Sequence, residues 1–269
     1  MLIDSVDVSY VPSLAVLNLM KKREKKNAYL GQSEELFAMG DAIYGDNSAA
    51  TSRGSKSEFF KDLRGKRGKV IDITQLKWSN LPGTAQELNK VSPFFDRKNI
   101  LRQNSVTEKN LKALNRSGEL SKYKYLLFAT HGLFVPNRPE LSSIVLSQKF
   151  NDEENDGYIT VGEWMGYDLR SDLIYLSACE SGLGYYQVGE GIVGIPYALT
   201  VAGNKDTVMS LWKVDDAATA EFTSTFFEKL SKGQSEVAAL NATKREFINS
   251  ANSKYKNPSA WSAFVLYGI

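Results

Sequence analysis

The feature that most constrains the fold is a set of three segments whose centres are apolar on both faces. They read KYLLFATHG (124–132), DLIYLSACESG (172–182) and DTVMSLWKV (206–214). A strand of this kind needs cover on both faces, which is typical of a parallel sheet packed between helices. Segments with helical spacing alternate with them, such as 191–203 and 217–233. The sequence therefore predicts an α/β fold, with a mostly parallel sheet flanked by helices on both faces.

We expect a single domain over residues 1–269, because the sequence has no internal repeat and no low-complexity tract. Within it, 1–70 is expected to be an N-terminal extension and 71–269 the core that carries the chemistry. In the extension, residues 11–26 predict a short amphipathic helix with a basic end.

The extension also contains a segment rich in glycine, serine, lysine and arginine, at 41–69, with seven basic residues. We interpret this segment as a surface loop. The alternative is a nucleic-acid patch, but such a patch usually interleaves aromatic residues with the basic ones, and here acidic residues intervene. We therefore expect no direct contact with nucleic acid.

Composition argues against several other classes. The net charge is +2, and no apolar run approaches the roughly 18 residues that span a bilayer, so we expect no membrane association. The N-terminus lacks the basic and apolar regions of a secretory signal. One cysteine and one histidine are too few for an intramolecular disulfide or a Cys/His zinc site. We expect a cytoplasmic protein without metal or cofactor, in a reducing compartment that keeps a lone thiol usable.

The single histidine and the single cysteine occupy equivalent places. His131 and Cys179 each end a predicted buried strand, and glycine follows each within three residues, at Gly132 and Gly182. Ligands of an open α/β sheet bind beyond the carboxyl ends of its strands. An imidazole beside a thiol can take its proton, and the thiolate can attack a carbonyl. The backbone N–H groups of Gly132 and Cys179 are candidate donors to the resulting oxyanion.

The alternative is that both residues only pack in the core, since a cysteine at the end of a buried strand is usually inert. The coincidence of the two on similar strand ends favours a site. The order also discriminates between classes, because His131 precedes Cys179 by 48 positions. Papain-like enzymes have the opposite order, whereas caspases place the histidine about 50 residues upstream.

At these residues the sequence resembles the CHAT domain, a caspase-like module often found after tetratricopeptide repeats in bacterial proteins. The resemblance implies a caspase/separase-type fold and peptide-bond hydrolysis, with His131 as base, Cys179 as nucleophile and Gly132 as oxyanion donor. The matching motifs are VPSLAVL (11–17), LPGTAQEL (81–88), YLLFATHG (125–132), DGYITVGEWMGYDL (156–169), LIYLSACESGLG (173–184), GEGIVGIPYALTVAG (189–203), SLWKVDDAAT (210–219) and AWSAFVLYG (260–268).

The resemblance also implies a substrate pocket around Ser177, Trp212, Asp215 and Asp216. Ser177 stands where caspases have the glutamine of their aspartate-binding pocket, so an aspartate preference is not expected. Either Asp215 or Asp216 would favour a basic residue before the scissile bond. The alternative for both is that they cap the helix that follows.

A calcium loop is a further alternative to weigh, because residues 152–163 fit part of an EF-hand pattern. An EF-hand needs an entering helix, and 142–150 reads as a strand. We therefore interpret 152–163 as a turn that leads into a helix.

The function expected from the resemblance is a cysteine endopeptidase that cleaves a protein partner in bacterial defence or regulated proteolysis. The chain lacks the long cleavable linker that caspases carry after the cysteine, so we expect control by a regulatory protein or a fused repeat or sensor domain. The alternative is a catalytically silent caspase-like scaffold that binds other proteins.

Overall fold

The structure is a computed structural model. It describes residues 3, 5–25, 32–45, 76–135, 138–178, 185–187 and 191–269, with the backbone alone at 24–25, 185–187 and 191–193. The predicted nucleophile Cys179 and the 46–69 part of the basic segment lie outside the described residues.

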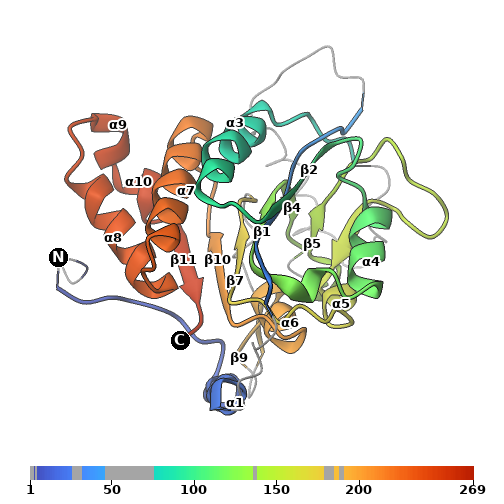
Figure 1. Ribbon diagram of the computed structural model, residues 1–269, viewed down its shortest axis with the longest axis horizontal. Helices are drawn as coiled ribbons and strands as arrows, with labels where there is room; N and C mark the ends of the chain where they lie inside the picture. Colours follow the sequence, from blue (N-terminus) through green and yellow to red (C-terminus); the bar gives the residue numbers. More distant parts are fainter. Residues whose placement is uncertain are drawn as a thin grey trace.

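Six strands form the central sheet, in the spatial order β11-β10-β7-β3-β1-β2 (Figure 1). Neighbouring strands are parallel except β11, which is antiparallel to β10. The predicted mostly parallel sheet is therefore confirmed. Its strands are β1 (Glu34–Ala42), β2 (Lys98–Gln103), β3 (Tyr123–Ala129), β7 (Leu173–Leu176), β10 (Asp206–Ser210) and β11 (Phe264–Tyr267).

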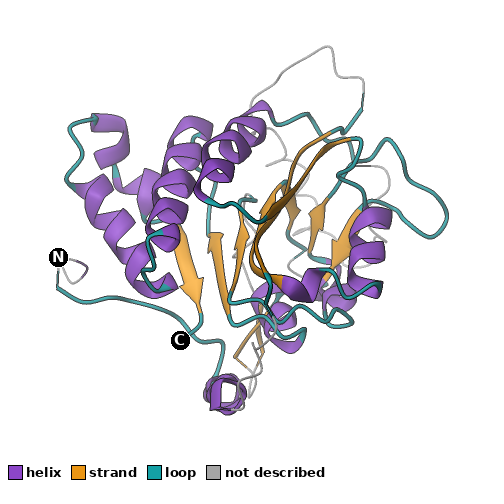
Figure 2. Ribbon diagram, in the orientation of Figure 1, coloured by secondary structure: helices purple, strands orange, loops and turns teal. Residues whose placement is uncertain are grey.

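Helices cover both faces of this sheet (Figure 2). One face packs on α3, α7, α8 and α10, and the other on α4, α5 and α6. The described helices are α1 (Leu14–Lys25), α3 (Pro82–Val91), α4 (Glu108–Arg116), α5 (Val161–Trp164), α6 (Ile195–Val201), α7 (Asp216–Ser231), α8 (Glu236–Ile248), α9 (Ser253–Lys256) and α10 (Pro258–Trp261), with 3-10 turns at Ser92–Phe94, Leu120–Lys122 and Pro139–Leu141.

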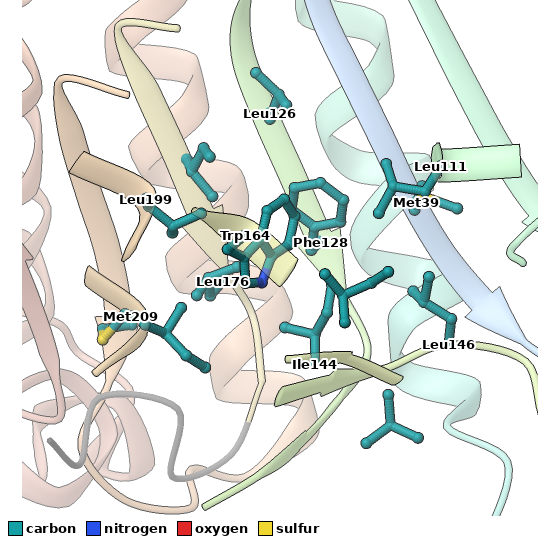
Figure 3. Close-up of a cluster of buried hydrophobic side chains, with 14 of the residues drawn as sticks. Met39, Leu111, Leu126, Phe128, Ile144, Leu146, Trp164, Leu176, Leu199 and Met209 are labelled. Atoms are coloured by element: carbon teal, nitrogen blue, oxygen red, sulfur yellow. The ribbon is translucent and has the colours of Figure 1, made fainter. Parts of the chain in front are cut away.

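The doubly apolar strands explain this arrangement. Along β1, Phe37 and Met39 point into one apolar cluster, whereas Leu36 and Ala38 point into the cluster on the opposite face. Successive side chains of a strand alternate between faces, so a run that is apolar throughout is buried only when both faces are covered. Figure 3 shows the cluster that contains Met39, where side chains of the sheet meet Trp164 and Leu199.

Two small antiparallel sheets complete the described strands. One has the order β4-β5-β6, with β4 at His131–Leu133, β5 at Ser143–Val145 and β6 at Tyr158–Thr160. The other pairs β8 (Tyr185–Gln187) with β9 (Gly191–Val193).

The strand predicted to run to His131 is divided in two. Its pairing with β1 ends at Ala129, and the chain enters β4 at His131. The physical reason is a change of backbone partner, because the N–H of His131 bonds to the Tyr44 hydroxyl instead of to a strand of the central sheet. His131 therefore lies beyond the carboxyl edge of the sheet and not within β3.

The N-terminal segment closes the β11 edge of the sheet. Tyr10 forms a parallel bridge with Tyr267, donating its N–H to Leu266 and accepting one from Gly268. An unpaired strand edge invites association with another chain, so this pairing covers an otherwise exposed edge. The predicted amphipathic helix follows as α1, where the Arg23 side chain donates to carbonyl oxygens at the end of α6.

A buried carboxyl group lies at the start of β10, beside the end of β11. Asp206 is fully buried, and its Oδ1 accepts the N–H of Ile269 at 3.0 Å. Its Oδ2 has no hydrogen-bond partner among the described residues. Burial raises the pKa of Asp206 from 3.8 to about 8, against the opposing effect of Lys205. The folded protein therefore holds a proton here that the unfolded chain releases.

This linkage predicts how the Asp206→Asn variant behaves. Between pH 3.8 and about 8 the unfolded chain is ionised at this position while the folded chain is not, so stability falls as the pH rises. Within this range the ionisation of Asp206 lowers the free energy of unfolding by about 1.4 kcal/mol for each pH unit. Asparagine cannot ionise. The free energy of unfolding, measured with urea at pH 5 and pH 7, is therefore expected to depend less on pH in the variant than in the wild type. Equal slopes for the two proteins would contradict the prediction.

Candidate active site

Three neighbouring strands end at the same edge of the central sheet. Parallel pairing joins β1 to β3 and β3 to β7, so Tyr44, His131 and Ser177 follow adjacent strand ends. Phe128 pairs with Leu176, an offset of 48, and the Ser177 N–H continues the ladder by donating to Phe128 at 2.9 Å. His131 and Cys179 are separated by the same number of positions in the sequence. The expected adjacency of the two strands is confirmed.

The His131 imidazole is held by a backbone carbonyl. Its Nε2 lies 2.7 Å from the Ser79 carbonyl oxygen. A carbonyl oxygen only accepts hydrogen bonds, so Nε2 carries the proton of the neutral ring. The other nitrogen, Nδ1, is then the basic one. The ring is thereby set in the tautomer that a general base at Nδ1 requires.

Two aromatic rings fix the plane of the imidazole. The Tyr44 ring lies edge-on at 4.7 Å between centroids, and the Trp78 ring lies at 4.9 Å. Trp78 is itself held, because its Nε1 donates to the Tyr158 hydroxyl at 2.9 Å. Asn80 accepts the Tyr44 N–H through Oδ1 at 3.0 Å. Three consecutive residues, 78–80, therefore support the histidine from one side.

Sequence reasoning missed these supporting residues. Trp78, Ser79 and Asn80 come directly before the LPGTAQEL motif, and that position was the only available signal. Ser79 acts through its carbonyl, which every residue has, so its identity carries no information. Tyr44 is 87 positions from His131 and follows a different strand, so only the fold brings them together.

The N–H of Gly132 points away from β5. Leu146 donates its N–H to Gly157 on the β6 side, so by alternation Val145 faces β4, where it pairs with His131. Successive N–H groups of a strand point to opposite edges. The Gly132 N–H therefore points to the edge of β4 that is not paired with β5.

Ser177, one of the predicted pocket residues, is buried. Only 5% of its surface is exposed, and its hydroxyl donates to Oε2 of Glu87 at 2.9 Å. Glu87, on α3, is also buried and was not singled out from the sequence, although it lies within LPGTAQEL. A direct role of Ser177 toward substrate stays a prediction.

Asp215 and Asp216 have different environments. Asp215 caps α7, because its Oδ1 accepts the N–H groups of Ala217 and Ala218 at 3.1 and 3.2 Å. Asp216 is half-buried against Gly83 of α3, where an added Cβ would lie 3.0 Å from its Oδ2. The capping alternative therefore applies to Asp215. Asp216 occupies space that is open because Gly83 has no side chain.

Trp212 is exposed at the carboxyl edge. It follows β10 by two positions, 39% of its surface is accessible, and its Nε1 donates to the Ser259 carbonyl at 3.2 Å. The bond orients the ring while leaving part of it open to another molecule.

The loop at 152–163 is not an EF-hand. Strand β5, and not a helix, leads into it. Asp152 accepts hydrogen bonds from Glu154 and Asn155 within the loop, and Glu163 forms a capping box with Thr160. Among the described residues no group of three histidine, cysteine or acidic side chains is arranged to hold a metal ion. In that same part of the chain no helix has the length and apolar character needed to cross a membrane.

The sheet order and the helices on both faces define a caspase-like fold. The chain belongs to the CHAT domain family, whose model matches residues 1–269.

Solved structures share the fold, and one curated relative is similar to part of the chain. Two crystal structures of the Saccharomyces cerevisiae separase–securin complex match at TM-scores of 0.51 and 0.54, with 16% identity, over 98% of this chain and 14% of that chain. The Arg-specific cysteine proteinase gingipain R (RgpB), a Porphyromonas gingivalis protein, matches at 0.50, with 11% identity, over 93% of this chain and 51% of its own. Tetratricopeptide repeat protein 28 of Mus musculus is 26% identical over 110 residues, which is 41% of this chain and 4% of that protein.

Proposed function

We propose that this protein is a cysteine endopeptidase in which Cys179 is the nucleophile and His131 the base. One observation carries the proposal: the hydrogen bond from His131 Nε2 to the Ser79 carbonyl, beyond the end of β3 and beside β7. It leaves Nδ1 as the basic nitrogen of the only histidine in the chain.

The chemistry follows in two halves. Nδ1 of His131 takes the thiol proton of Cys179, and the thiolate attacks the scissile carbonyl. The negative oxygen of the tetrahedral intermediate accepts the N–H of Gly132, whose direction away from β5 is consistent with this role. The C–N bond breaks as Nδ1–H protonates the leaving amine. Water, deprotonated by Nδ1, then hydrolyses the thioester and regenerates the thiol.

We propose a protein substrate with a basic residue before the scissile bond. Asp216, half-buried against Gly83, is the carboxylate that would pair with such a side chain. Gingipain R, similar in fold, is described as Arg-specific, which is consistent with this choice. Trp212 would contact a neighbouring substrate residue through its exposed ring.

We also propose that a protein partner controls the activity. The mouse relative is a tetratricopeptide repeat protein, and the separase structures contain securin, which supports a fused repeat region or a bound regulator. The family resemblance suggests bacterial defence or regulated proteolysis as the setting. A lone, usable cysteine fits the reducing cytoplasm.

The test is a proteome-wide comparison of new peptide ends in cells that carry the wild type or the Cys179→Ala variant. Cleavage ends that vanish with the variant, preceded by lysine or arginine, are the expected result. Equal circular dichroism of the two proteins controls for folding. Identical sets of ends would leave the non-catalytic scaffold as the better description.

A further inference from the structure

We propose that Tyr44 is a positioning residue for the base, acting through both its hydroxyl and its ring on His131. The inference rests on the proposed dyad. It concerns a residue that follows the end of a different strand, β1, and contacts His131 through both its hydroxyl and its ring.

The hydroxyl of Tyr44 stands between two strands. It accepts the N–H of His131 at 3.2 Å and donates to the carbonyl oxygen of Val145 at 2.8 Å. His131 and Val145 face each other in the β4–β5 register, at a position where antiparallel strands ordinarily bond directly. One oxygen atom therefore bonds to the backbone of both strands and links His131 to Val145.

The ring of Tyr44 restrains the imidazole itself. The two rings meet edge to face, at 4.7 Å and 66°. Tyr44 is only 6% exposed, and Asn80 holds its backbone N–H. Nε2 is bound to Ser79 and the Trp78 ring also lies beside the imidazole. Tyr44 adds one restraint at the His131 backbone and another at its ring.

The Tyr44→Phe variant separates the hydroxyl from the ring. Phenylalanine keeps the aromatic contact but removes the hydroxyl, so the His131 backbone loses its bond to Tyr44 and the link through that oxygen to Val145. The imidazole is then less firmly positioned. Because a misplacement of about 1 Å in a catalytic group costs about 10²-fold in rate, a small shift is measurable.

The experiment measures the rate at which iodoacetamide alkylates Cys179 between pH 5 and 9. The chain has one cysteine, so the rate reports this thiol alone. The wild-type profile is expected to report a thiol pKa below the ordinary value of about 8.5. The His131→Ala profile is expected to report the ordinary pKa. Tyr44→Phe is expected to move toward the His131→Ala profile, with about tenfold slower alkylation at pH 6.5.

The matched control is Tyr167→Phe. Tyr167 is also buried, and its hydroxyl has no hydrogen-bond partner in the described part of the chain, so the same chemical change should leave the wild-type profile. Thermal melting verifies that each variant is folded. Should Tyr44→Phe fail to fold, Asn80→Ala decides, because it removes the bond that holds the Tyr44 backbone. It is expected to shift the profile in the same direction.

The outcomes separate the two proposals. If the wild type and His131→Ala give the same profile, the dyad is wrong and the role of Tyr44 falls with it. If the wild type differs from His131→Ala but Tyr44→Phe, or Asn80→Ala in its place, matches the wild type, the dyad stands and the positioning role is overturned.

Discussion

Replacing His131 by alanine is expected to reduce peptide hydrolysis by 10²–10⁴-fold, the contribution typical of a positioned general base. The cause is local, because His131 is the only imidazole in the chain and no second histidine can substitute for it. The measurement is the initial rate on a peptide taken from a cleavage end that depends on Cys179, compared with the wild type at pH 7.

A glutamine at the same position is the matched variant. Its side-chain amide can still donate to the Ser79 carbonyl, as Nε2 of His131 does, but it cannot accept a proton at neutral pH. We expect the same loss of activity with less loss of stability than alanine causes. Near-normal hydrolysis by the glutamine variant would show that the imidazole is not the base.

Replacing Phe222 by alanine is expected to lower the free energy of unfolding by about 3–5 kcal/mol. Phe222, on α7, is fully buried, stacks on Phe264 of β11 at 4.0 Å and 9°, and meets Phe247 of α8 edge to face. The truncation leaves a cavity where two helices and the last strand meet, and close packing prevents full relaxation.

Urea unfolding at constant pH measures this loss, with Phe150→Ala as the control. Phe150 is 42% exposed, so the same truncation there is expected to change stability by about 0.5 kcal/mol or less. A loss below about 1 kcal/mol for Phe222→Ala would indicate that the α7–α8–β11 junction is loosely packed.

Much of the fold was predictable because its signals are local. The doubly apolar strands required a covered sheet, and Thr107 begins α4 through a local bond, accepting the Asn110 N–H. The division of the β3 segment at Ala129 was not predictable, since it depends on the hydroxyl of Tyr44, a residue from another strand.

The sequence alone also singled out His131 and Cys179, because their rarity and their strand-end positions are visible without a structure. Their 48-position spacing agrees with the β3–β7 register, since parallel neighbours keep a constant offset. The sequence left both alternatives, cap or substrate contact, open for Asp215 and Asp216. Only backbone geometry assigned the α7 cap to Asp215 and set Asp216 against Gly83.

Tertiary structure decided the state of the histidine. Its tautomer follows from a carbonyl oxygen at Ser79, and its place between the strands follows from the hydroxyl of Tyr44. Neither could be inferred from the sequence. Every residue has a backbone carbonyl, so the identity of Ser79 gives no signal, and the Tyr44 hydroxyl reaches His131 only in the folded chain. Local pattern singled out the residues proposed to carry chemistry, and long-range packing determined how the histidine is held.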